Sequence, residues 1–160
     1  MIWFYLDPSA WVKRYAAEPG SEVMDALWEA FTRGQGRAFC GWLGFSELVW
    51  VLQRWRNRRG QDEEAFRTVY WQFRQDCQQV VWCSLSWQQV QASVSWIVRY
   101  NLNATDALHL QLALEQASLG NGEVWLVSSD RRLVRAARSE SLKSLDPEYC
   151  VIDTVKEIFG

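Results

Sequence analysis

The sequence predicts an α/β fold in which helices cover both faces of a central parallel β-sheet, a three-layer arrangement of the Rossmann-like type. Short, mostly apolar segments recur along the chain, and longer segments with apolar residues at helical spacing separate them. The chain has 160 residues, of which 49% are hydrophobic and 22% charged, a balance that excludes a disordered or collagen-like protein. No repeat, low-complexity tract or linker divides it, so we expect a single domain over residues 1–160.

Each expected strand is a short, mostly apolar run. The first, Ile2–Leu6, leads into Asp-Pro-Ser, which is the pattern of a buried strand followed by the start of a helix. The expected strands are Ile2–Leu6, Arg37–Cys40, Val80–Ser84, Glu123–Val127 and Tyr149–Ile152.

The expected helices fill the intervals between the strands. In Ser21–Thr32, for example, Val23, Leu27 and Phe31 recur every four residues and therefore share one helix face. Glycines and prolines mark several of the helix ends. The expected helices are Ser9–Ala17, Ser21–Thr32, Leu43–Arg59, Asp62–Gln78, Trp87–Tyr100, Asn103–Leu119 and Asp130–Arg138.

The composition excludes several classes of function. The formal net charge of −2 gives no overall attraction for nucleic acid, so only a local cluster of arginines could provide it. The four cysteines form no C-x-x-C pair and have no histidine at zinc spacing, which argues against a structural zinc site and favours buried thiols in a reducing compartment. A single histidine, His109, excludes nuclease mechanisms that need two. The reactive groups of an enzyme would therefore be carboxylates.

The cellular location follows from the apolar segments. The longest of them, Met1–Leu6, is far shorter than the ~20 residues that a membrane span needs. No basic segment precedes it, as one would in a signal peptide. We therefore expect a cytoplasmic protein with no membrane partner.

Four carboxylates each have two possible roles, a local structural one and one in a functional site. Asp7 and Asp130 each follow an expected strand and precede an expected helix, so either residue could cap that helix. Asp106 follows Asn103 at capping-box spacing, and Glu47 could be a solvated helical side chain. Taken singly, each structural role is the commoner one.

Their joint placement favours a metal site. Ligands of parallel sheets bind at the carboxyl ends of the strands, where Asp7 and Asp130 both lie. Glu47 has mostly apolar neighbours in a helix that we expect to be largely buried, and burying an unpaired carboxylate is costly. A cation shared with Asp106 and the other three acids would remove that cost, and an all-oxygen site selects Mg²⁺ or Mn²⁺.

Five short motifs, in order along the chain, carry a resemblance to a known family. They are Tyr5-Leu6-Asp7-Pro8-Ser9-Ala10 with Lys13, Glu18-Pro19-Gly20-Ser21-Glu22, Ser46-Glu47-Leu48 with Arg54, Ala104-Thr105-Asp106-Ala107-Leu108-His109-Leu110, and Leu126-Val127-Ser128-Ser129-Asp130-Arg131-Arg132-Leu133. The chain thereby resembles PIN domains, most closely their VapC-type toxin branch, from Phe4 to about Ile152. It departs from the family in Pro8, where a small or hydroxyl residue is frequent, and in its 11 tryptophans.

The resemblance implies a Mg²⁺-dependent endoribonuclease (Mn²⁺ being an alternative ion) that acts on RNA, forms a homodimer and is silenced by a cognate antitoxin protein. The family's acidic positions fall on Asp7, Glu47, Asp106 and Asp130. The first three of these are expected to hold the principal ion, and Asp130 to act through water or on a second ion. The family's hydroxyl positions beside the metal fall on Ser9 and Ser128, which could equally satisfy backbone groups at helix ends.

The remaining expectations concern arginines and the histidine. Arg54 lies two helical turns, ~10.5 Å, beyond Glu47 on the same helix face, and Arg131 begins an arginine cluster after Asp130. We expect both arginines to bind RNA phosphates. We expect His109 to be a packed, hydrogen-bonded helix residue rather than a catalytic one.

The tryptophans divide into two expected groups. Trp28, Trp50 and Trp71 have helical spacing and are expected in the core. Some of the others are expected on the surface, where they would contact a second copy of the chain or an antitoxin: Trp11, Trp42, Trp55, Trp82, Trp87 and Trp96. Stacking on bases is the least favoured use.

Other functions stay open. A PIN nuclease for RNA processing would lack an antitoxin, and a non-catalytic module would bind RNA or protein through the same fold. A haloacid-dehalogenase-type phosphatase is disfavoured, because that family needs a second aspartate where this chain has Ser9.

Overall fold

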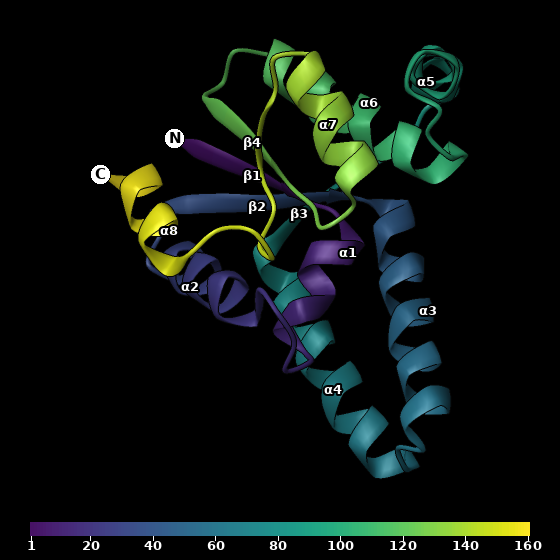
Figure 1. Cartoon of the computed structure of the whole chain (residues 1–160), viewed down its shortest axis with the longest axis vertical. Coiled ribbons are helices and arrows are strands. Elements are labelled where there is room, and N and C mark those ends of the chain that lie inside the picture. Colours follow the sequence, from purple (N-terminus) through teal and green to yellow (C-terminus); the bar gives the residue numbers. More distant parts are fainter.

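The structure is a computed structural model that describes residues 1–160, and it confirms the predicted α/β architecture (Figure 1). Its strands are β1 Ile2–Leu6, β2 Gly36–Gly41, β3 Val80–Cys83, β4 Glu123–Val127 and β5 Lys143–Leu145. Its α-helices are α1 Pro8–Trp11, α2 Ser21–Thr32, α3 Trp42–Arg59, α4 Glu63–Asp76, α5 Trp87–Tyr100, α6 Ala104–Ser118, α7 Arg131–Ser139 and α8 Ile152–Phe159. Two 3₁₀ turns lie at Val12–Arg14 and Cys77–Gln79.

The five strands form one parallel sheet in the order β3-β2-β1-β4-β5. β1 is central and pairs with β4 so that Leu6 lies opposite Val127. The pairing continues one residue further, because the backbone N–H of Asp7 donates to the carbonyl of Val127 at 3.0 Å. The turns that follow β1 and β4 therefore start side by side.

The alternation of side chains along β1 divides the interior into two cores. Phe4 and Leu6 pack in a cluster with residues of α1, α2, α3, α4 and α8, whereas Tyr5 packs on the opposite face against α6 and α7. All three side chains are fully buried, as a central strand with helices on both faces requires. Figure 1 shows these two helical layers on either side of the sheet.

The end of the chain differs from the prediction. Tyr149–Ile152 is not a strand: the last strand is Lys143–Leu145, and Ile152 begins α8. The edge strand pairs with β4 through its backbone while Lys143 lies exposed, so it lacks the apolar run by which buried strands are recognised. The first expected helix, Ser9–Ala17, is also shorter, because the α-helix ends at Trp11 and a 3₁₀ turn follows at Val12–Arg14, after which residues 15–17 are not helical. The other predicted elements are within two residues of their observed ends.

α3 and α4 form a helical hairpin that extends beyond the sheet (Figure 1). Only Gly44, Leu48 and Leu52 of α3 are buried, so the expectation of a largely buried helix is wrong. For the same reason Trp50 and Trp71 lie on the surface, 59% and 66% exposed, and not in the core.

The other tryptophans are divided between core and surface. Trp28 is buried as predicted, and so is Trp11, which stacks on it. Trp42 and Trp87 are exposed, whereas Trp55, Trp82 and Trp96 are half-buried.

The cysteines are free thiols, of which Cys40 is buried and Cys77, Cys83 and Cys150 are half-buried. None of the helices has both the length and the apolar character that crossing a membrane would require.

A buried ion pair fixes the base of the hairpin to the segment after β1. Asp76, at the end of α4, accepts hydrogen bonds from Arg14 Nε at 2.7 Å and from Tyr15 Oη at 2.9 Å. Asp76 is 5% exposed, and the Arg14 guanidinium also lies over the Trp28 ring, 4.7 Å from its centroid. The carboxylate is therefore satisfied only by this arrangement of the two segments.

We predict that Asp76→Ala lowers the free energy of unfolding by about 1–3 kcal/mol, because it leaves Arg14 Nε and the Tyr15 hydroxyl without their acceptor, while Arg14 keeps only its ion pair with the exposed Asp25. Asp153→Ala is the control, since the Asp153–Lys156 pair is exposed to solvent and its loss should change the stability much less. Urea denaturation of the three proteins measures the difference. Equal losses in the two variants would contradict the proposed role of Asp76.

Candidate active site

Asp7 is the most buried of the candidate carboxylates and is held by two serines. Its Oδ2 accepts hydrogen bonds from the Ser9 backbone N–H at 3.1 Å, from Ser9 Oγ, and from Ser128 Oγ at 3.1 Å. The two serine hydroxyls also lie 3.2 Å from each other. Asp7 caps α1, with Pro8 at the first helical position, so its expected capping role is confirmed and leaves its other oxygen, Oδ1, free for another role.

Asp130 occupies the equivalent turn after β4. Its Oδ1 caps α7 by accepting the backbone N–H groups of Arg132 at 2.8 Å and Leu133 at 3.0 Å. Its own backbone N–H donates to Ser128 Oγ at 3.0 Å, and the N–H of Ser129 donates to Ser9 Oγ at the same distance. The serines therefore join the turns after β1 and β4 into one hydrogen-bonded unit. Both of their alternative roles, satisfying backbone groups and orienting a carboxylate, are seen together.

Glu47 is held by a chain of buried groups that the sequence did not reveal. His109 Nε2 lies 2.6 Å from Glu47 Oε2 and 3.8 Å from Asp7 Oδ1. On the other side of the ring, Nδ1 lies 2.7 Å from Tyr5 Oη, which also accepts the backbone N–H of Gly41 at 3.2 Å. Each ring nitrogen of His109 therefore has a hydrogen-bond partner, Tyr5 Oη at Nδ1 and Glu47 Oε2 at Nε2. His109 is packed and hydrogen-bonded, as expected, but it lies between two acids.

Asp106 lies in the first turn of α6. Its backbone N–H donates to Asn103 Oδ1 at 2.9 Å, and its Oδ2 accepts from Asn103 Nδ2 at 2.7 Å, which confirms the capping relationship. Its charge interacts with those of Asp7, Asp130 and Glu47, so this carboxylate belongs to the same cluster.

The four carboxylates share one feature. Each has one oxygen fixed by hydrogen bonds within the protein, and its other oxygen accepts none. The fixed atoms are Asp7 Oδ2, Glu47 Oε2, Asp106 Oδ2 and Asp130 Oδ1. A carboxylate with one anchored oxygen keeps its orientation and can still offer the other oxygen to a ligand.

The electrostatics of the cluster favour a bound cation. Burial raises the pKa of Asp106 to about 7, and the charges of Asp7 and Asp130 add to this effect. Burial also raises the pKa of Asp7, with a smaller contribution from the charge of Glu47. Burial disfavours the charged form of His109, but its hydrogen bond to Glu47 and the charge of Asp7 outweigh this and raise its pKa.

A hard divalent cation fits this donor set chemically, because all four acids offer oxygen and their mutual repulsion would be relieved. As the side chains stand, however, no group of three or more acidic, histidine or cysteine residues has metal-binding geometry. Glu47 instead bonds to His109, and Asp106 to Asn103.

The two arginines expected to bind phosphate are exposed and have no carboxylate partner. Arg54 lies over the ring of Trp50, 4.5 Å from its centroid, about two helical turns along α3 from Glu47. Arg131 lies over the ring of Tyr149 at 4.6 Å, directly after Asp130. Each is close to an acid in sequence and is held by an aromatic ring.

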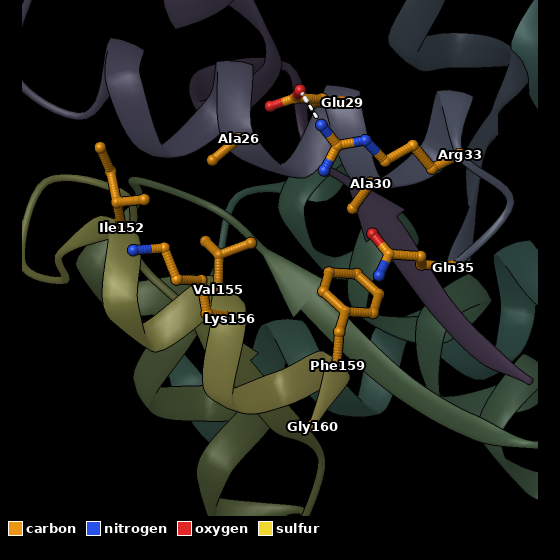
Figure 2. A pocket seen from close by; sticks show the side chains of 10 residues that line it. All are labelled: Ala26, Glu29, Ala30, Arg33, Gln35, Ile152, Val155, Lys156, Phe159 and Gly160. Atoms are coloured by element: carbon orange, nitrogen blue, oxygen red, sulfur yellow. Dashed lines mark hydrogen bonds and ion pairs between the residues drawn. The ribbon is translucent and has the colours of Figure 1, made fainter.

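A pocket of about 340 Å³ lies away from the candidate residues, between α2 and α8 (Figure 2). Its walls combine the apolar side chains of Val155 and Phe159 with an ion pair between Glu29 and Arg33. Phe159 packs near Gly36, where β2 begins, so this pocket lies at the amino end of the strand. None of the candidate site residues lines it.

We predict that, without divalent metal, the folded protein loses stability as the pH rises from about 4 to 7. Folded Asp106, with a pKa of about 7, binds a proton more tightly than the unfolded chain, where the pKa is 3.8, so stability falls across that interval. The raised pKa values of Asp7 and His109 act in the same direction. Asp106→Asn should therefore flatten the profile in part, and the exposed Glu157→Gln should leave it unchanged.

Denaturation in EDTA at a series of pH values measures this profile. A wild-type protein that gains stability between pH 5 and 7, or an Asp106→Asn profile as steep as that of the wild type, would contradict the crowding of these acids.

Comparisons with known proteins agree with this architecture. Residues 4–139 match the family described as PIN domain. The crystal structure of PAE2754 from Pyrobaculum aerophilum superposes with a TM-score of 0.67 at 13% sequence identity, covering 99% of this chain and 89% of that one, which shows a shared fold. No curated protein matches the sequence. The matched region contains all four carboxylates and both serines, and the chain therefore belongs to the PIN domain family, whose members are generally nucleases.

Proposed function

We propose that this protein is a Mg²⁺-dependent endoribonuclease whose active site is formed by Asp7, Glu47, Asp106 and Asp130. One observation carries the proposal: all four carboxylates are fixed through one oxygen and offer the other, at the carboxyl edge of a parallel sheet. Membership of a family of nucleases supports the reaction class. Mn²⁺ would serve in place of Mg²⁺, since both prefer oxygen ligands.

Each residue of the proposed active site has a role that follows from its position. Asp7, Glu47 and Asp106 would hold the principal ion, and Asp130 would act through water or on a second ion. When bound, the ion would supply a nucleophilic water at neutral pH and neutralise charge on the phosphate. Ser9 and Ser128 keep Asp7 in place by donating to Oδ2, and His109 does the same for Glu47 through Nε2. Arg54 and Arg131 would bind the RNA backbone on the two sides of the acids.

The biological role that we propose is that of a toxin, inhibited by a cognate antitoxin protein and active as a cytoplasmic homodimer. This role rests on the resemblance of five motifs to VapC-type toxins. The exposed indoles of Trp42, Trp50, Trp71 and Trp87 offer apolar surface for such contacts. A small upstream open reading frame with a DNA-binding segment would favour the toxin over an RNA-processing nuclease. Sedimentation of the purified protein would test the dimer.

We predict that Asp7→Asn and Asp130→Asn each lower Mg²⁺-dependent RNA cleavage by at least about 10²-fold, because an amide oxygen caps a helix but lacks the charge that holds the ion. Without metal, both variants should be as stable as the wild type or more stable, since repulsion between carboxylates is relieved. Gel-resolved cleavage of a labelled RNA and thermal denaturation in EDTA measure the two effects.

Asp62→Asn is the matched control for these variants. Asp62 caps α4 by accepting the Ala65 backbone N–H at 2.8 Å, and it lies at the hairpin tip. It therefore has the same local role as Asp7 and Asp130 without a place in the cluster. We expect Asp62→Asn to cleave RNA at the wild-type rate. If both cluster variants did so as well, Asp7 and Asp130 would not belong to the active site, and their hydrogen bonds would serve only to cap α1 and α7. Absence of cleavage by the wild type would instead favour a non-catalytic binding module.

We also predict that Mg²⁺ or Mn²⁺ raises the melting temperature of the wild type. At ten times its Kd, a metal that binds only the folded state adds about 1.4 kcal/mol, or roughly 4 °C for a domain of this size. Asp7→Asn should lose most of the shift, and Asp62→Asn should keep it. An unchanged melting temperature at millimolar metal would contradict the metal site independently of any activity assay.

A further inference from the structure

A second group of charged side chains lies next to the carboxylates, beyond Asp130. A cavity of about 270 Å³ is lined by α7 and by the segment after β5, and three arginines of α7 form part of its wall: Arg131, Arg135 and Arg138. These arginines are four and three residues apart, so they project from one face of the helix. α7 begins directly after Asp130, which places this face next to the candidate active site.

The three guanidinium groups are not neutralised, and two of them are held by uncharged groups. Arg131 lies over the Tyr149 ring, 4.6 Å from its centroid, and Arg138 Nε donates to Ser144 Oγ at 2.8 Å. None of the ion pairs in the structure includes these arginines. Because the aromatic ring and the hydroxyl are uncharged, the positive charges remain available to a ligand.

Asp146 is the acidic residue of the cavity wall and does not cancel this charge. It is 8% exposed, and its Oδ1 accepts the Glu148 backbone N–H at 3.0 Å. The wall thus combines three guanidinium groups with one mostly buried carboxylate. Its net charge is positive, although the whole chain is slightly acidic.

We propose that this cavity binds a backbone phosphate of the RNA substrate at a nucleotide other than the one that is cut. The inference rests on the proposed nuclease function. Guanidinium groups bind phosphate oxygens through paired N–H donors, and an unpaired group can do so without first breaking an ion pair. Tyr149, 64% exposed, presents an aromatic face at the same wall.

The position of the cavity fits a strand that also reaches the acids. The N–H of Ser128 donates to the Leu145 carbonyl at 3.1 Å, so the ends of β4 and β5 lie together. Arg131 follows Asp130 directly, and Arg138 lies ~10.5 Å further along the helix axis. A strand with one phosphate at the carboxylates therefore passes the cavity as it continues along α7.

The test is RNA binding measured without cleavage. A fluorescein-labelled single-stranded RNA is titrated with protein in EDTA, and anisotropy is followed at several salt concentrations. We expect Arg135→Ala to weaken binding about three- to tenfold. The slope of log K against log salt should become shallower by about 0.7 for each phosphate that the variant no longer neutralises, and the Arg135→Ala/Arg138→Ala double variant should exceed the single one.

Two variants serve as controls. Arg33→Ala removes the same charge near the pocket between α2 and α8, so it measures the effect of net charge alone. Arg132→Ala removes a charge from α7 itself. Arg132 does not line the proposed cavity but lines a second one, which shares Arg135 with it, so this variant measures the contribution of the second cavity. Both should bind RNA more tightly than Arg135→Ala, with a salt slope close to that of the wild type.

The outcomes separate this inference from the proposed function. If Arg135→Ala and the double variant bind RNA no worse than the two controls, or if the wild type does not bind RNA, the phosphate site is wrong. Cleavage by the wild type would then leave the nuclease proposal standing. If the cavity variants lose binding but the wild type does not cleave RNA in Mg²⁺, the site is right and the nuclease proposal fails. A single-stranded DNA of the same sequence should be affected equally, since the interaction is with phosphate.

Discussion

The parallel pairing of β1 with β4 is the constraint on which the candidate site depends. Because Leu6 lies opposite Val127, both strands end at the same level, and the turns after them start side by side. The hydrogen bond from Asp7 N–H to the Val127 carbonyl extends this pairing into the turn. Asp7 and Ser128, more than a hundred residues apart in the chain, can then share a hydrogen bond of 3.1 Å. A shift of one residue would turn these side chains to the opposite face of the sheet.

Bringing four acidic side chains together destabilises the folded protein, and neighbouring residues reduce this destabilisation. Four acids lie close enough for burial and mutual repulsion to raise the pKa values of Asp7 and Asp106. His109 reduces this cost, because its Nε2 faces both Glu47 and Asp7. Tyr5 fixes the ring from the other side and is itself fixed by the Gly41 N–H. These residues come from β1, β2 and α6, so orienting Glu47 requires the assembled fold rather than a local motif.

The sequence identifies the parts of this fold whose signals are local. β1 is a wholly apolar run and β4 is apolar after Glu123, and the prediction gives the bounds of both without error, as it does for α2 and α5. β5 escapes prediction because an edge strand with an exposed lysine is held by pairing to β4 rather than by burial of its own side chains. Trp50 and Trp71 have the spacing of core residues, but the hairpin that carries them extends past the sheet, and spacing alone does not show how far a helix extends. The acids and serines have recognisable motifs, whereas the partnership of His109 with Glu47 joins residues 62 positions apart and has no local signal.

Around the candidate site, unpaired acidic residues and unpaired arginines lie next to each other, which the small net charge of the chain does not reveal. Arg14, Arg33, Arg67 and Arg99 each pair with a carboxylate elsewhere in the molecule. The arginines of α7 have no such partner, and none of the four clustered acids pairs with an arginine or lysine, although Arg131 is the neighbour of Asp130 in sequence. The cap explains this: Asp130 turns one oxygen to the N–H groups of α7, while Arg131 extends over Tyr149. A site that must bind a cation and a polyanion together needs both sets of charges unneutralised, because an ion pair between them would have to be broken before either ligand could bind.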